Sequence, residues 1–176
     1  MTPFVLDDGP FAVVAKHVNG AWAWPAATLH VVREVAVPPL DRSRERHELR
    51  QRALALSCAA GPLIAVHDLL VGGPAAEYLY DHLRPQEGHS TLNLGEDVSI
   101  ALCAVQMPAG VFVSMDKHAM MVALGELGRG RVASSFDVWD ELRAASLISA
   151  EEFRLLCDVT LAQNRSLPGL PRRFAP

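Results

Sequence analysis

The stretch PFVLDDGPFAVV, residues 3–14, joins a short apolar run, two adjacent acids and a second apolar run. The first run predicts a β-strand that ends at Asp7. The second predicts an α-helix with Pro10 in its first turn, where proline is favoured because no backbone N–H is needed there. A strand that leads directly into a helix is typical of α/β folds, and it leaves Asp7 and Asp8 at the carboxyl end of the strand.

The same alternation of strand-like and helix-like patterns continues along the chain. Short apolar runs, several of them rich in β-branched residues, predict strands near residues 4–7, 29–33, 63–67, 111–115 and 131–133. Helical spacing predicts helices over residues 10–18, 42–60, 74–83, 94–107, 117–127, 136–146 and 149–164. Strands that alternate with helices imply right-handed crossovers and a mostly parallel sheet covered on both faces. The predicted fold class is therefore α/β, a three-layer α/β/α sandwich.

Length and composition indicate one globular domain. The chain has 176 residues, half of them apolar and a fifth charged, which is enough to bury a core. We expect the domain to cover residues 1–165 and the Pro-rich segment 166–176 to be a poorly ordered tail. The net charge of -4 argues against a uniformly basic surface of the kind that binds nucleic acid without specificity.

Targeting and cysteine usage give two further expectations. No apolar run reaches the roughly 18 to 20 residues of a membrane span, and the N-terminus lacks a basic segment followed by a long apolar core, so we expect a cytoplasmic protein with no membrane partner. Cys58, Cys103 and Cys157 each lie in an apolar stretch with helical spacing, which favours buried thiols over disulfides or a zinc site.

Acidic residues stand at the carboxyl ends of two predicted strands and at the start of one predicted helix. Asp7 and Asp116 each end a predicted strand, and Glu96 and Asp97 occupy the first turn of a predicted helix. Carboxyl ends of parallel strands meet at one edge of the sheet, so these acids could meet there. Clustered carboxylates repel one another unless a cation lies between them, and ligands that are all oxygens suit Mg²⁺ or Mn²⁺.

Each of these acids also has a simpler interpretation. Asp8 and Asp116 stand where helix caps are favoured, and Glu96 and Asp97 carry the negative charge that stabilises a helix start. The metal-site hypothesis depends on the joint pattern rather than on any single acid.

Three segments resemble motifs of the PIN-domain family. VLDDGPFA, from Val5, is similar to the first strand of these proteins, and LGEDVSIALCA, from Leu94, is similar to their central acidic helix. VFVSMDKHA resembles the next strand, with Ser114 two positions before Asp116. The three motifs occur in the family's order, and the resemblance covers nearly the whole chain.

The resemblance implies a metal-dependent ribonuclease that hydrolyses phosphodiester bonds of single-stranded RNA, as in the VapC-like toxins of bacterial toxin–antitoxin pairs. It implies an antitoxin partner, a homodimer and a Mg²⁺ or Mn²⁺ cofactor. In this sequence Asp7, Glu96, Asp97 and Asp116 take the positions of metal ligands. Ser114 would orient a ligand or a bound water through a hydrogen bond.

One position departs from the family's pattern. PIN domains supply a further acid from the helix after the second strand, and Glu34 is the nearest acid here, about one helical turn early. Pro38 and Pro39 occupy the expected place, and Asp41 and Glu45 lie beyond it. We therefore assign Glu34 to the catalytic set with Asp7, Asp97 and Asp116, and keep as alternatives an exposed strand-end glutamate and a catalytically degenerate PIN-like binding or scaffold module.

Other conspicuous residues have competing interpretations. A phosphoacceptor receiver-like domain would need a phosphorylatable acid such as Asp68 and a late lysine, but no lysine follows Lys117. The seven histidines show no paired metal-ligand spacing along the sequence. Core packing is favoured over base stacking for the three tryptophans, which are Trp22, Trp24 and Trp139. The dense basic cluster either follows a phosphate backbone or is a solvated helix face; it comprises Arg42, Arg44, Arg46, Arg50 and Arg52.

Overall fold

A computed structural model describes residues 2–17, 29–37, 44–58, 61–85 and 92–163. Within these residues, five strands form a sheet in the order β5-β2-β1-β6-β7, and every neighbouring pair is parallel. The strands are β1 (Phe4–Leu6), β2 (Leu29–Val32), β5 (Ile64–His67), β6 (Val111–Val113) and β7 (Val132–Ala133). All five lie where the sequence predicts them, so the parallel α/β fold is confirmed.

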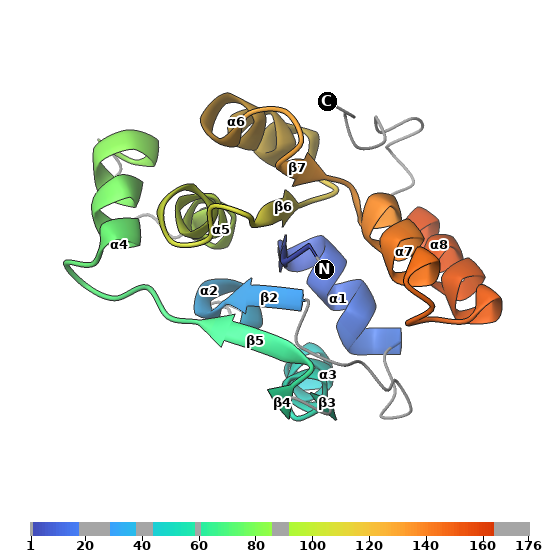
Figure 1. The fold of residues 1–176 in the computed structure, drawn as a ribbon. Coiled ribbons are helices and arrows are strands. Elements are labelled where there is room, and N and C mark those ends of the chain that lie inside the picture. The colour runs from blue at the N-terminus through green and yellow to red at the C-terminus, as the bar shows by residue number, and fades with distance from the viewer. Residues whose placement is uncertain (1, 18–28, 38–43, 59–60, 86–91, 164–176) are drawn as a thin grey trace.

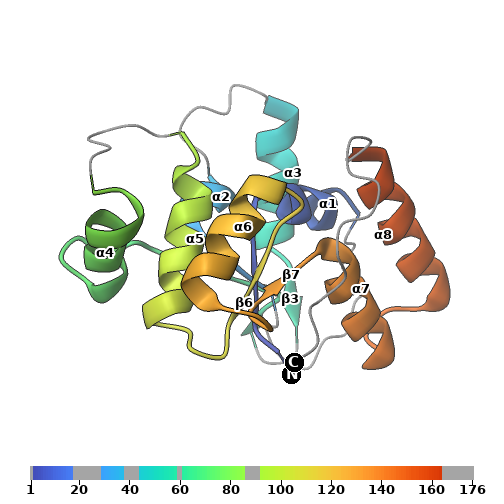
Figure 2. The same cartoon turned by 90° about the horizontal axis from the view of Figure 1, so that it is seen from above.

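Helices cover both faces of the sheet, which gives the predicted three-layer sandwich (Figures 1 and 2). One layer contains α4 (Pro74–Tyr78), its π-helical continuation η1 (Leu79–Leu83), α5 (Leu94–Val105) and α6 (Lys117–Leu127). The other contains α1 (Asp8–His17), α3 (Arg44–Leu54), α7 (Ser135–Ala144) and α8 (Ala150–Gln163). The short helix α2 (Arg33–Ala36) follows β2 directly at the carboxyl end of the sheet.

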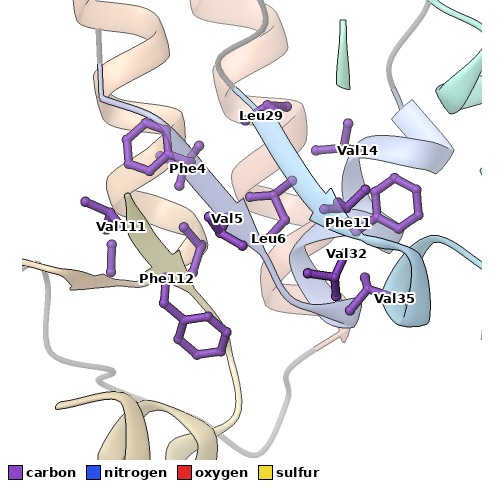
Figure 3. Close-up of a cluster of buried hydrophobic side chains, with 14 of the residues drawn as sticks. Phe4, Val5, Leu6, Phe11, Val14, Leu29, Val32, Val35, Val111 and Phe112 are labelled. Carbon is purple, nitrogen blue, oxygen red and sulfur yellow. The ribbon is translucent and has the colours of Figure 1, made fainter. Parts of the chain in front are cut away.

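The central strands β1 and β6 are apolar throughout because both of their faces are covered. Phe4, Val5 and Leu6 of β1 are fully buried, and Figure 3 shows them beside Leu29 of β2 and Phe112 of β6. Continuous apolar runs of this kind are typical of parallel sheets. Sheets with one face exposed to solvent instead show strands in which apolar and polar residues alternate. The core therefore fixes β1 at the centre of the sheet, with the acid that follows it at the rim.

The helix predicted over residues 42–60 is wrong in its second half. Helix α3 ends at Leu54, and β3 (Ser57–Cys58) pairs antiparallel with β4 (Gly61–Pro62) as a separate two-stranded sheet. Leu63 N–H donates to the Leu56 carbonyl at 2.9 Å, which turns the chain back toward β5. Cys58 accordingly lies in a strand rather than a helix.

Several expectations fall on residues outside the described ranges. These are the tail, Trp22, Trp24, the Pro38-Pro39 pair, Asp41 and Arg42. In the described residues, Cys103 is buried in α5, and burial raises the pKa of its thiol to about 12. Trp139 is fully buried, and its Nε1 donates to Thr160 Oγ1 at 3.0 Å, so it joins α7 to α8. No helix among the described residues has the length and apolar character to cross a membrane.

Candidate carboxylate site at the end of the sheet

Asp7 is a buried carboxylate at the end of the central strand. Its backbone N–H donates to the Val113 carbonyl at 2.9 Å, which extends the pairing of β1 with β6 by one position. The residue is only 4% exposed. Its Oδ1 accepts from the Asp8 N–H at 2.6 Å and its Oδ2 from Ser114 Oγ at 2.7 Å. Each carboxylate oxygen keeps a further lone pair, so these hydrogen bonds leave room for a cation.

Ser114 joins the ends of the two central strands. It is fully buried, donates to Asp7 Oδ2, and accepts the backbone N–H of Asp116 at 3.0 Å. A hydroxyl can do both because it carries one donor and two acceptor sites. This contact is what an orienting role for Ser114 requires, and the role itself stays a prediction.

Asp116 is the N-cap of α6. Its Oδ1 accepts the backbone N–H groups of His118 at 2.6 Å and Ala119 at 3.1 Å, as an N-cap carboxylate does. The helix-cap interpretation therefore holds for this acid. Its charge nevertheless acts on both Asp7 and Glu96, and in each case it raises the pKa of the neighbouring carboxyl.

Glu96 is the acid whose pKa is raised by the charges of all the neighbouring aspartates. It lies half-buried in the first turn of α5, and its pKa is raised to about 8, first by burial and then by the charges of Asp7, Asp116, Asp97 and Asp8. Burial likewise raises the pKa of Asp7 to about 6, although its two hydrogen bonds oppose this. The acids therefore lie within electrostatic reach of one another, as carboxylates that repel in a shared site do.

Asp97, next to Glu96, forms an ion pair with the side chain of Arg84. Its Oδ2 lies 3.3 Å from Arg84 Nη1, and the Arg84 side chain is almost completely buried. Arg84 Nη2 also donates to the Leu92 carbonyl at 3.0 Å. The side chain thus ties the end of η1 to the start of α5, and its charge offsets that of Asp97. The sequence interpretation did not include Arg84.

Asp8 is paired in the same way with Arg50 of α3. The guanidinium donates to Asp8 Oδ1 and to the Val35 carbonyl, and lies 5.7 Å from the ring centroid of Phe11. Arg50 is buried, so the solvated-face interpretation of the basic cluster is wrong for this residue. It holds for Arg44, which pairs with Glu48 one helical turn away at 2.9 Å.

Glu34 lies near the cluster but is not joined to it. It belongs to α2, and its buried Oε2 has no hydrogen-bond partner in the part of the chain that the structure describes. Its charge is not among those that raise the pKa of Asp7 or Glu96. Gly95 brings the first turn of α5 against α2, since a Cβ on Gly95 would stand 2.8 Å from Val35 Cγ2.

A divalent cation fits this site in donor chemistry and in charge. Asp7, Glu96 and Asp116 offer only carboxylate oxygens, the ligands that Mg²⁺ and Mn²⁺ prefer. Over the described ranges, no three or more His, Cys, Asp or Glu side chains are already arranged as a metal-binding group. Binding would therefore require these carboxylates to turn toward a common point, where the charge of the cation would offset their repulsion.

Comparison with known protein families, curated proteins and solved structures gives no match to this chain. The similarity to PIN domains thus stays a prediction from three short motifs. The molecule itself provides a buried aspartate at the centre of a parallel sheet, a serine that is hydrogen-bonded to it, and further acids within electrostatic reach.

The close approach at Gly95 gives a first test of the site's framework. We expect Gly95→Ala to lower the free energy of unfolding by about 1–3 kcal/mol, because the new methyl overlaps a stiff Val35 side chain. Gly125→Ala is the control, since a Cβ there meets no atom within 4 Å and alanine is favoured in a helix by about 0.5–1 kcal/mol. Urea unfolding measures both. A Gly95→Ala variant as stable as the wild type would show that α2 and α5 are not in close contact.

Proposed function

We propose that this chain is a PIN-like ribonuclease that uses Mg²⁺ or Mn²⁺ to hydrolyse single-stranded RNA. The observation that carries the proposal is the mutual effect of Asp7, Glu96 and Asp116 at the carboxyl end of the parallel sheet, where the pKa of Glu96 rises to about 8. So much negative charge at one point favours a bound cation. The PIN-like motifs supply the substrate class and the reaction.

The proposal assigns a different role to each group of residues at the site. Asp7, Glu96 and Asp116 hold the cation, and Ser114 keeps Asp7 oriented through the 2.7 Å hydrogen bond. A bound divalent cation lowers the pKa of its water and offsets charge on the phosphoryl transition state. Asp97 balances Arg84 and supports the start of α5, and Glu34 would join the set only by turning its carboxylate toward the cluster.

The biological assignment follows from the resemblance to VapC-like toxins. On that basis we propose a cytoplasmic toxin that forms a homodimer and is neutralised by an antitoxin protein.

A catalytically degenerate PIN-like binding or scaffold module is the second candidate, and specific contacts favour it. Glu34 contributes no charge to the cluster, Asp97 is paired with Arg84, and Asp116 caps α6. A receiver-like domain has no such support, because Asp68 follows the edge strand β5 and pairs with Arg33. Asp68 therefore does not meet Asp7.

Cleavage of a fluorescently labelled single-stranded RNA pool decides between the two candidates. We expect the purified protein to cleave it with Mn²⁺ or Mg²⁺ and to lose all activity in EDTA, because activation of water depends on the cation. Double-stranded RNA is the substrate control. Mn²⁺ binding without cleavage of any RNA would establish the degenerate module, and cleavage that continues in EDTA would contradict the metal-dependent mechanism.

A further inference from the structure

Two histidines that are far apart in the sequence meet where β2 pairs with β5, to one side of the central strand β1. Strands β2 and β5 are parallel neighbours, and the register places His30 beside Ala65 and Val32 beside His67. Because His30 and His67 stand two positions apart in this register, both point to the same face of the sheet. His30 Nδ1 lies 3.0 Å from His67 Nε2, with ring centroids 5.2 Å apart.

A small hollow adjoins His67 on this face. It has a volume of about 10 Å³ and lies between His67 and Val32 of the sheet and Leu102 and Gln106 at the end of α5. That is close to the space that one water molecule requires. Both imidazoles are partly exposed, so a small solute can reach them.

Burial favours the neutral form of both rings. Burial lowers the pKa of His30 to about 4, and the neighbouring His67 adds to this. Burial also lowers the pKa of His67, with Asp68 opposing the shift. The nearby charges are Asp68 and Arg33, which form an ion pair with each other. A neutral imidazole has one nitrogen with an available lone pair, the form in which histidine binds metals.

We propose that His30 and His67 form a two-imidazole chelate for a transition-metal ion of the Zn²⁺ class, separate from the carboxylate site. Two Zn–N bonds of about 2.0–2.1 Å at a tetrahedral angle place the nitrogens roughly 3.3 Å apart, a few tenths of an ångström beyond the 3.0 Å seen here. No third His, Cys, Asp or Glu is gathered with them within the described ranges, so water completes the coordination.

Ligand chemistry separates this chelate from the carboxylate site. Imidazole nitrogen suits Zn²⁺, Cu²⁺ and Ni²⁺, whereas oxygen-only sites suit Mg²⁺ and Mn²⁺. The histidine pair lies on the edge strand β5 and on β2 beside it, and Asp7 follows the central strand β1. The inference therefore stands whether or not the protein cleaves RNA.

Calorimetric titration with Zn²⁺, in a large excess of Mg²⁺ to occupy the carboxylates, tests the chelate. We expect one site whose affinity falls at least tenfold in both His30→Gln and His67→Gln, because each removes one of two nitrogen ligands. His47→Gln, at an exposed position of α3, is the matched control and should bind as the wild type does. Zn²⁺ binding that is unchanged in both pair variants would overturn the proposal.

Nitrogen-15 NMR of the wild type gives a second readout that needs no variant to fold. Coordination through His30 Nδ1 and His67 Nε2 leaves the ring protons on His30 Nε2 and His67 Nδ1, so Zn²⁺ should fix opposite tautomers in the two rings. Mg²⁺ alone should leave both rings unchanged. If Zn²⁺ shifted neither ring, or shifted only one, a chelate between them would be excluded.

Discussion

Asp7→Asn is expected to lower kcat for RNA cleavage by about 10³-fold, which corresponds to roughly 4 kcal/mol at 1.36 kcal/mol per factor of ten. The substitution removes the charge of the central ligand while keeping its shape. The fold should survive, since the Asn Oδ1 can still accept from the Asp8 N–H and the new amide can donate to Ser114 Oγ. Single-turnover cleavage in saturating Mn²⁺ measures the effect.

Two further variants make this experiment specific. Asp116→Asn should also lose most of the rate, with some loss of stability because Asp116 caps α6. Asp140→Asn removes one charge from the exposed face of α7, in the opposite helix layer, and should cleave RNA at the wild-type rate. Wild-type cleavage by both Asp7→Asn and Asp116→Asn would show that the active site lies elsewhere.

The stability of the metal-free protein is expected to fall as the pH rises from about 4 to about 8. The pKa values of Asp7 and Glu96 are raised in the folded chain, to about 6 and about 8. Between its unfolded and folded pKa values, each group binds more proton in the folded state, so raising the pH favours unfolding. Asp7 alone contributes about 2–3 kcal/mol at 1.36 kcal/mol per pH unit, and Glu96 contributes less than its pKa implies because it is half-exposed.

Urea unfolding of EDTA-treated protein across this pH range measures the fall. Adding Mn²⁺ should reduce it, because a bound cation replaces the protons that the carboxylates would otherwise retain. Asp7→Asn should remove the contribution of Asp7 to the fall in stability, which lies between about pH 4 and pH 6. Stability that instead increased over the whole range in EDTA would show that the pKa values of Asp7 and Glu96 are not raised in the folded chain.

The sheet could be predicted because its signals are local. Each strand of the five-stranded sheet is a short apolar run between helical patterns, and β1, β2, β5, β6 and β7 appear where those runs occur. The helix that was predicted through Cys58 failed because the apolar spacing continues past Leu54 while the chain turns into a hairpin. That turn depends on the Leu56–Leu63 backbone contact, which hydrophobic periodicity does not encode.

The candidate site was predictable only in part. Asp7, Ser114 and Asp116 stand at the ends of strands, so sequence position and the rule for parallel sheets place them together. The counter-charges of the neighbouring acids were not predictable, because Arg50, for example, reaches Asp8 through the packing of α3 against α1. The His30–His67 contact was missed for a related reason. Metal-ligand spacing detects residues on one element, and this pair depends on the register of two strands.

The position of β1 in the sheet also determines when the site can form. β1 pairs with β2 on one side and with β6 on the other, and the hydrogen bond from Ser114 to Asp7 joins residues 107 positions apart. A growing chain that has released only β1, β2 and β5 therefore has an unpaired edge on β1 and lacks the serine that donates a hydrogen bond to Asp7. Contacts of such long sequence separation form late and slowly, and an open edge invites pairing with other chains. A product that stops before Val111 should aggregate and carry no carboxylate site, so the site is assembled only after most of the chain has been synthesised.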